Sequence, residues 1–403
     1  MEKSMRTRNR VVTLLTNEYP PYVFGGGATF SKQVAEWLSS SGWRVFVIAG
    51  KAGIYERVSV EKINEKLTVM RVYFPGIPPR WLLYAVFSRN YLKMLLNRYK
   101  VIVLSNNLLT WLSLKCLKGF KNVTNVITVF HGSPYSLLTF FHHVTWDVLK
   151  EISLEELAYY AQAPLVNHLI RKDMFTSDRY VFVADHVVEE YESLFGDEVK
   201  DLRRRGVVVY PGVEFEDLVE LRQKVGRARR GKIIIAYIGR LYYVKGVTQA
   251  VKAVEDLTER GYRKDVELWV FGKGPLEPWL EHYLKRRKLL KNVRLFGFVE
   301  RSKLLSLMAK YVDVLLHPSL YEGAPLAVME AQALGIPVVA YDLPWAWEFI
   351  IDGVNGYKAR YPDTAKLAEG VVKAARLNAS AVMLSAEKYD RKRTLRKLES
   401  VLE

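Results

Sequence analysis

The chain has 403 residues, of which 50% are hydrophobic and 26% charged, a composition typical of a folded protein with two or three domains. Its formal net charge of +17 attracts polyanions, so nucleic acid, an anionic membrane surface and phosphorylated small molecules are the candidate partners. One cysteine excludes an intramolecular disulfide, and the charged first ten residues and the lack of an apolar run of about 20 predict a cytoplasmic protein.

The first βαβ unit is predicted near the start of the chain. Val11 to Leu15 are continuously apolar, which indicates a buried parallel strand, and residues 28–40 have helical spacing. Between them, Gly26 and Gly27 form part of a glycine loop at the carboxyl end of the strand, where ligands of doubly wound sheets bind. Glycines there leave backbone amides accessible to an anion, although a tight turn alone would need the same residues.

Residues 80–100 combine aromatic side chains at helical spacing with interleaved Lys and Arg. A helix of this kind lies on an anionic membrane surface, or it packs on the sheet while its basic side chains reach solvent. The second arrangement is the more usual one, and peripheral membrane attachment is kept as the other option.

A histidine follows the strand predicted over residues 125–130. His131 would lie at the carboxyl end of that strand, where ligands bind, although a lone histidine is more often structural. His142 and His143 are adjacent on a helix-prone segment that runs from 134 to 176, so they point apart and do not indicate a shared metal.

A second βα series begins with the apolar strand predicted over residues 232–238. Arg240 and Lys245 follow it between glycines, and two cations at a strand end predict a diphosphate site, although either alone is an ordinary surface residue. A later strand ends at Phe298 and Val299, in a turn that begins with Gly297.

Two carboxylates, Glu322 and Glu330, stand eight positions apart around a predicted helix at 325–334, bounded by Pro325 and Gly335. The amides at its start are those of Gly323, Ala324 and Leu326. A helix N-terminus suits a phosphate, and carboxylates beside it suit the hydroxyls that flank the diphosphate of a nucleotide sugar. Alternatively, Glu322 is solvated and Glu330 pairs with a Lys or Arg.

These motifs resemble the retaining glycosyltransferases of family 4. The resemblance rests on G-R-L-x-x-x-K-G at 239–246 and on P-S-x-x-E-G-x-P-L-x-x-x-E-A-x-A-x-G-x-P at 318–337. It implies the GT-B fold, an α/β architecture of two doubly wound Rossmann-like domains facing across a cleft. The implied acceptor-binding domain covers residues 1–212 and is joined by the C-terminal helix at about 385–403, and the nucleotide-sugar-binding domain covers 213–384.

The resemblance also implies a role for each candidate residue. It places Glu322 on the donor sugar, Glu330 on the ribose, Arg240 and Lys245 on the leaving diphosphate, His131 near the sugar 6-hydroxyl, Gly26 and Gly27 against the donor phosphates, and Phe298 and Val299 beside the base. The implied reaction moves a hexose from a UDP-, GDP- or ADP-sugar to a sugar, glycan or lipid-linked acceptor with retention. Fixed cations replace a metal, so no metal or other cofactor is expected.

Three other functions share part of this pattern. A glycogen-synthase-like or trehalose-type disaccharide-forming glucosyltransferase differs only in its acceptor. A sugar phosphorylase would carry a pyridoxal cofactor on a lysine. A basic nucleic-acid-binding protein would explain the net charge but leaves Glu322 and Glu330 without a role, so no nucleic acid partner is predicted. The sequence does not identify the donor sugar, the acceptor or the oligomeric state.

Overall fold

The structure is a computed structural model of the chain. It describes residues 10–23, 25–52, 59–74, 80–106, 110–115, 122–132, 151–152, 154, 156–157, 161, 163–196, 198, 201–228 and 231–402. Outside these residues lie Cys116, His142 and His143, as well as Phe24, which precedes the glycine loop. The chain divides into two compact units: the first contains Met1–Ser133, Pro164–Gly212 and Lys392–Glu403, and the second contains Pro134–Ala163 and Val213–Arg391.

The first unit is built on an eight-stranded sheet with the order β3-β4-β2-β1-β5-β6-β7-β8. All its neighbouring strands are parallel except the β3–β4 pair at one edge. The strands are β1 (Val11–Thr16), β2 (Arg44–Ala52), β3 (Ser59–Lys62), β4 (Leu67–Phe74), β5 (Val101–Ser105), β6 (Val123–Phe130), β7 (Arg179–Phe182) and β8 (Gly206–Val208). The strand order reverses between β1 and β5: β2, β4 and β3 lie on one side of β1, and β5 to β8 lie on the other, as in Rossmann folds.

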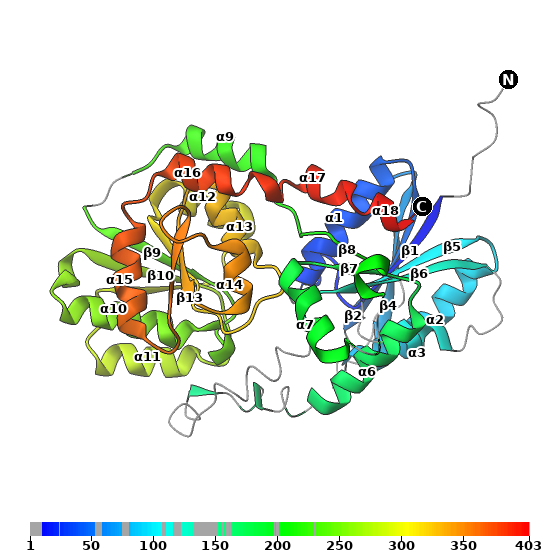
Figure 1. Ribbon diagram of the computed structural model, residues 1–403, viewed down its shortest axis with the longest axis horizontal. Helices are drawn as coiled ribbons and strands as arrows, with labels where there is room; N and C mark the ends of the chain where they lie inside the picture. The colour runs from blue at the N-terminus through cyan, green and yellow to red at the C-terminus, as the bar shows by residue number, and fades with distance from the viewer. Residues whose placement is uncertain are drawn as a thin grey trace. The chain divides into compact units, whose positions relative to one another are not determined.

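Helices cover both faces of this sheet (Figure 1). They are α1 (Gly26–Ser40), α2 (Arg80–Leu96), α3 (Thr110–Lys115), α6 (Ala163–Thr176), α7 (Asp185–Phe195), α8 (Leu202–Arg205) and, at the end of the chain, α18 (Glu399–Leu402); α17 (Arg391–Arg396) precedes α18 at the boundary between the units. Val11 and Leu15 of β1 pack into one core cluster with α2, while Val12 and Leu14 point to the opposite face and are also fully buried. Burial on both faces explains why β1 is continuously apolar.

The helix predicted over residues 80–100 is α2, which packs against β2 and β4. The hydroxyl of Tyr84 donates to the carbonyl of Ile48 at 2.7 Å, and Leu92 and Leu96 are fully buried. The arrangement in which this helix packs on the sheet is therefore confirmed. Among the described residues, no helix has both the length and the apolar character needed to cross a membrane.

The second unit has a six-stranded, wholly parallel sheet with the order β11-β10-β9-β12-β13-β14. The strands are β9 (Ile233–Ile238), β10 (Val266–Phe271), β11 (Val293–Gly297), β12 (Val314–Leu316), β13 (Val338–Tyr341) and β14 (Gly356–Ala359). This is the strand order 3-2-1-4-5-6 of the doubly wound fold, with its switch point between β9 and β12.

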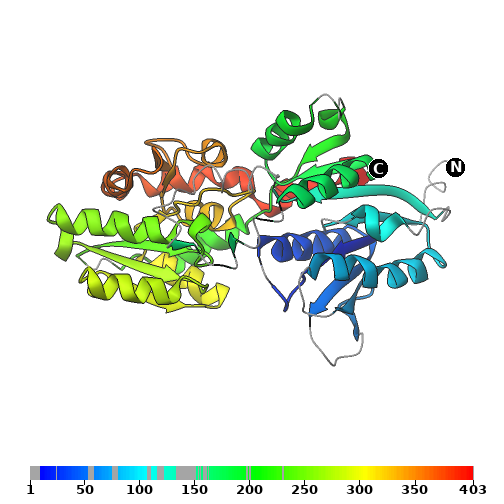
Figure 2. The same cartoon turned by 90° about the horizontal axis from the view of Figure 1, so that it is seen from below.

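The helices of the second unit are also divided between the two faces of its sheet (Figures 1 and 2). Its helical elements are α9 (Phe215–Val225), η2 (Tyr243–Lys245), α10 (Val247–Glu259), η3 (Tyr262–Lys264), α11 (Glu277–Arg286), α12 (Arg301–Tyr311), α13 (Leu326–Ala333), α14 (Pro344–Phe349), α15 (Thr364–Ala374), α16 (Ala379–Ser385) and η4 (Glu387–Tyr389). Helices α10 and α15 pack together over one face, and α9 packs with α12 and α13 on the other. The prediction of two doubly wound α/β domains is confirmed.

The two units meet between Gly212 and Val213, as predicted, but two other segments group differently from the predicted domains 1–212 and 213–384. Residues 134–163 group with the second unit, because Glu151 and Glu156 contact Lys252 and the start of η2. The chain returns to the first unit at Lys392 rather than at about 385. There α18 packs on β7 and β8, and Asn125 donates to the carbonyl of Val401.

Candidate functional site

Three of the predicted donor-binding residues lie on two loops at the switch point of the second unit. The loop after β9 carries Arg240 and Lys245, and the loop after β12 carries Glu322. Because β9 and β12 are neighbouring parallel strands, their carboxyl ends meet at one edge of the sheet, where ligands of such folds bind. Residues 77 positions apart in sequence are thereby brought into contact.

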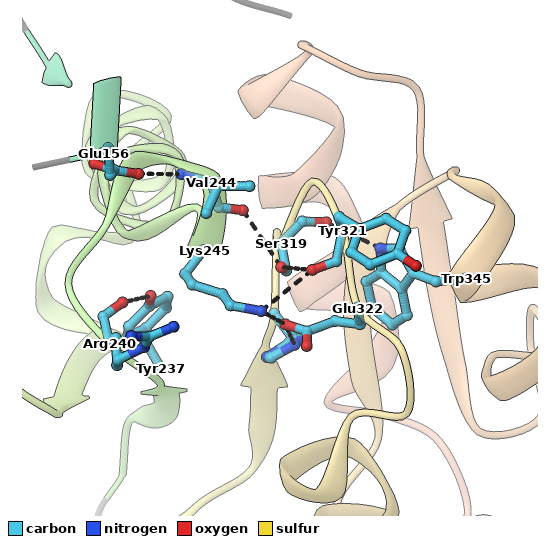
Figure 3. Close-up of polar contacts among 10 residues, drawn as sticks. Glu156, Tyr237, Arg240, Val244, Lys245, Ser319, Tyr321, Glu322 and Trp345 are labelled. Carbon is cyan, nitrogen blue, oxygen red and sulfur yellow. Dashed lines mark hydrogen bonds and ion pairs between the residues drawn. The ribbon is translucent and has the colours of Figure 1, made fainter. Parts of the chain in front are cut away.

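Tight packing holds these two loops together (Figure 3). The amide of Leu320 donates to the carbonyl of Val244 at 2.8 Å, and the hydroxyl of Ser319 donates to the same oxygen at 3.3 Å. Gly246 has a φ of +77°, and a Cβ on it would stand 2.1 Å from the carbonyl oxygen of Pro318. A side chain at 246 would therefore force the loops apart.

Lys245 and Glu322 form an ion pair at the centre of the site (Figure 3). The Nζ of Lys245 donates to Glu322 Oε1 at 2.8 Å and to the carbonyl of Tyr321 at 3.2 Å. The Nε2 of His317 lies 3.0 Å from the same Oε1. The side chains of Lys245, Glu322 and His317 are only 25%, 14% and 6% exposed, so the pair is largely shielded from water.

The electrostatics of this cluster keep Glu322 ionised. Burial raises the pKa of the Glu322 carboxyl, but the Lys245 ammonium and the hydrogen bond from His317 outweigh that effect and hold the pKa below its ordinary value. At neutral pH Glu322 is therefore an acceptor of hydrogen bonds and has no proton to donate.

Arg240 lies on the same loop as Lys245 but is exposed. Its guanidinium lies 5.0 Å from the centre of the Tyr242 ring, and its backbone carbonyl accepts from the Tyr237 hydroxyl at 3.0 Å (Figure 3). Burial raises the pKa of Tyr237, and Glu322 and Glu156 raise it further, so this phenol stays protonated and fixes the loop. The backbone of Arg240 is thus held in place, while its guanidinium is accessible from solvent.

Glu330 lies on α13, one turn after the loop that carries Glu322. Its side chain is 10% exposed, and its Oε1 accepts from the Nε and Nη2 of Arg301 at 2.9 and 2.5 Å. The sequence alternative in which Glu330 pairs with an Arg is thus present in the structure. The ion pair orients one oxygen of Glu330.

Helix α13 differs by one residue from its predicted start. Pro325 has a ψ of 96° and caps the helix, which begins at Leu326 rather than at 325. Gly335 has a φ of +70° and ends the helix as predicted. Leu326 is therefore the first residue of the helix, whose initial amides lack partners within the helix, and Gly323 and Ala324 lie in the loop before Pro325.

The remaining candidates of the second unit lie at the end of β11. Phe298 is 77% exposed and Val299 is half-buried, directly after Gly297 with its φ of +66°. A large exposed aromatic ring at the carboxyl end of a parallel strand is available to stack on a planar ligand.

In the first unit, Gly27 and His131 meet through a residue that was not predicted, Asn106. The Nδ2 of Asn106 donates to the carbonyl of Gly27 at 3.2 Å and to Ser31 Oγ at 2.5 Å, and its Oδ1 contacts His131 Nε2. Burial lowers the pKa of His131 to about 4, so the ring is neutral at pH 7. Gly26 is the exposed first residue of α1 beside this cluster.

Four site residues were missed at the sequence level. Asn106 directly follows an apolar strand, which is a usable signal. His317 precedes the recognised motif by one residue. Arg301 and Glu156 carry no local signal, because only tertiary packing brings them to Glu330 and to η2. Among the described residues, no group of three or more His, Cys, Asp or Glu side chains is placed to hold a metal.

Comparison with known proteins matches both units. The family described as Glycosyltransferase Family 4 matches residues 24–217, and the one described as Glycosyl transferases group 1 matches residues 219–391. An uncharacterized glycosyltransferase of Methanocaldococcus jannaschii is 26% identical over 362 residues, which cover 86% of this chain and 84% of that protein.

Solved structures show the same fold over nearly the whole chain. Sucrose-phosphate synthase from Thermosynechococcus elongatus aligns with a TM-score of 0.70 at 15% identity, over 98% of this chain and 96% of that one. Anabaena HepE in complex with UDP and glucose aligns with a TM-score of 0.67 at 17% identity, over 97% and 98%.

Proposed function

The chain belongs to glycosyltransferase family 4 and has the GT-B fold, and we propose that it transfers a hexose from a nucleoside-diphosphate sugar to a sugar, glycan or lipid acceptor with retention at the anomeric carbon. The observation that carries the proposal is the contact between Lys245 and Glu322 at the switch point of the second unit. The UDP and glucose bound by HepE support a nucleotide-sugar donor. We assign donor binding to the second unit and acceptor binding to the first.

In this reaction the bond between the anomeric carbon and the diphosphate oxygen breaks, and the acceptor oxygen forms a new bond to that carbon. Negative charge then develops on the leaving diphosphate, and Arg240, Lys245 and the amides of the loop at Gly323 and Ala324 supply fixed positive charge to stabilise it. These groups need no reorganisation and require no metal. The acceptor's proton passes to a leaving phosphate oxygen.

Glu322 orients the donor sugar rather than acting as acid or nucleophile. Its depressed pKa leaves it no proton to donate at neutral pH, and Lys245 and His317 both hold Oε1, which weakens that oxygen as a nucleophile. An ionised carboxylate accepts hydrogen bonds from sugar hydroxyls. Glu330, oriented by Arg301, would accept from the ribose hydroxyls in the same way, and Phe298 and Val299 would border the base.

The first unit supplies the groups proposed to face the acceptor and the transferred sugar. Gly26 and Gly27 form the loop beside the donor phosphates, and His131 approaches the sugar 6-hydroxyl. Because His131 is neutral and held by Asn106, it offers a hydrogen bond without adding charge near the anomeric carbon.

Thermal stabilisation by a panel of UDP-, GDP- and ADP-hexoses tests the donor site. The wild type should be stabilised by one nucleotide class, and the response should be lost in Lys245→Ala and Glu330→Ala. Lys366→Ala is the matched control, since this lysine is 58% exposed and pairs with Glu369 outside the site. A wild type that responds to no nucleotide contradicts the proposal.

Product analysis tests the finer points. With the responding donor, labelled transfer to glucose, glycan and lipid acceptors separates the proposed enzyme from a glycogen-synthase-like or disaccharide-forming one. The proton coupling at the new anomeric centre should match that of the donor, and activity should persist in EDTA. Inversion, or a loss of activity that Mg²⁺ restores, would contradict the retaining, metal-independent mechanism.

A further inference from the structure

Glu156 is a buried acidic residue that contacts the turn before Lys245 (Figure 3). Glu156 as a whole is 2% exposed, and it belongs to the segment 134–163 that groups with the second unit. One oxygen accepts from the amide of Tyr243 at 3.1 Å and the other accepts from the amide of Val244 at 3.2 Å. The carboxylate thus bridges the first two amides of η2.

This contact has a physical reason. The first amides of a helical turn have no partner within the turn, and a buried carboxylate needs donors to offset its desolvation. Two charge-assisted hydrogen bonds satisfy both requirements. Because Lys245 is the next residue after Val244, these bonds fix the backbone from which its side chain extends.

The turn is held from the other side by the loop that carries Glu322. The carbonyl of Val244 accepts from the amide of Leu320 and from the hydroxyl of Ser319, while its amide donates to Glu156. A single residue of η2 therefore connects the segment 134–163 to the Glu322 loop. Loss of the Glu156 bonds would remove one side of this support and leave the Glu322 side in place.

We propose that Glu156 is a positioning residue for Lys245 and so for the diphosphate of the donor. The inference rests on the proposed function, because it assumes that Lys245 binds the diphosphate. Glu156 itself contacts neither the donor nor the reacting atoms; it sets the orientation of the turn that presents the ammonium.

The same segment offers a matched control. Glu151 is 8% exposed and pairs with Lys252 of α10, whereas the amides of Tyr243 and Val244 donate to Glu156. Glu151 and Glu156 thus anchor the same stretch of chain with similar burial, and of the two it is Glu156 whose carboxylate accepts from the amides of the Lys245 turn. A purely structural role predicts similar behaviour for Glu151→Gln and Glu156→Gln.

The test is a double-mutant cycle on the full chain, with UDP, GDP and ADP as probes and the dissociation constant measured by calorimetry. Glu156→Gln keeps the side-chain volume but sets an amide NH₂ against a backbone donor, so we expect binding on the order of tenfold weaker. Lys245→Ala should weaken binding strongly in the wild type and much less in Glu156→Gln. Glu151→Gln should bind like the wild type even if its melting temperature falls.

Each outcome decides a different point. If the wild type binds none of the three probes, the proposed function fails. Suppose instead that the wild type binds one probe and that Lys245→Ala weakens this binding. The positioning role of Glu156 is then overturned if Glu156→Gln binds as Glu151→Gln does, or if the effects of Glu156→Gln and Lys245→Ala on binding are additive. Should Glu156→Gln not fold, Glu156→Asp keeps the charge but not the reach, and the same weaker, non-additive binding is expected.

Discussion

Replacing Lys245 by Met removes one charge from the Lys245–Glu322 pair while keeping an unbranched apolar side chain. At 2.8 Å and an effective dielectric constant of about 20, the direct attraction is about 6 kcal/mol, most of which desolvation cancels. Breaking a fully buried pair costs about 3–5 kcal/mol and an exposed pair at most about 1 kcal/mol. With side chains 25% and 14% exposed, this pair lies between, and we expect Lys245→Met to lower the free energy of unfolding by about 2 kcal/mol.

Urea titration followed by tryptophan fluorescence measures this change, since the indole of Trp345 donates to the carbonyl of Ser319 beside the pair. Lys245→Met, Glu322→Gln and the double variant form a cycle, and the double variant should cost about 1–2 kcal/mol less than the sum of the two single ones. The pKa of Glu322 is lowered, so the pair stabilises the fold above the ordinary carboxyl pKa and this contribution is lost as the pH falls through the depressed value. The coupling free energy between Lys245→Met and Glu322→Gln should therefore be equal at pH 7 and pH 6. Additivity within about 0.5 kcal/mol would refute the contact.

Three further predictions concern other candidate residues in the two units. Gly246→Ala should lower the free energy of unfolding by about 2–4 kcal/mol, because the φ of this residue is positive and the new Cβ would meet Pro318. Gly261→Ala is the control: its φ is +98° but the space around it is open, so it should cost about 1 kcal/mol. Equal costs for the two variants would contradict the close packing of the two loops. His131 has a pKa of about 4 in the folded protein and 6.5 in the unfolded chain, so the unfolded chain binds the proton first as the pH falls. The free energy of unfolding should therefore fall by up to about 3 kcal/mol as the pH is lowered from 6.5 to 4, and by less in His131→Gln. Asn106→Asp places a carboxylate against the ring and should raise the pKa of His131, which a flatter stability profile over the same pH range would show; an unchanged profile would contradict the Asn106–His131 contact.

The strands were predictable because burial on both faces of a parallel sheet gives continuous apolar runs, as in Val11 to Leu15 and in β9. The loops that follow such strands identify the ligand edge, and so Arg240, Lys245 and Glu322 could be located at that edge from sequence. Strand β3 was not predicted, since all four of its residues are exposed and it lies at the sheet edge with no alternation of polar and apolar side chains.

Contacts between distant segments were not predictable from local patterns. The sequence indicated that Glu330 could pair with a Lys or Arg, but the choice of Arg301 depends on how α12 and α13 both pack with α9. The attachment of Glu156 to η2 joins residues 87 positions apart, across a segment with no conspicuous motif. Residues 134–163, which include Glu156, group with the second unit rather than with the first.

The hydrogen bonds of Lys245 indicate which cation must bind most of the diphosphate charge. An ammonium has three N–H groups, and two of those of Lys245 are directed to Glu322 and to the carbonyl of Tyr321. At most one is left for a phosphate oxygen, and Glu322 already offsets much of the lysine charge. Arg240 is exposed on the same loop and offers a planar set of donors suited to phosphate.

Arg240→Met should therefore weaken binding of the nucleoside diphosphate at least as much as Lys245→Met, by on the order of tenfold or more, while changing the free energy of unfolding by less than about 0.5 kcal/mol. Lys245→Met should lower both binding and stability, because it also leaves Glu322 without its ammonium partner. Calorimetric titration and urea unfolding of the two variants measure both quantities. If Arg240→Met binds the nucleotide as the wild type does, the diphosphate charge is borne by other groups, and the assignment of Arg240 to the leaving group is wrong.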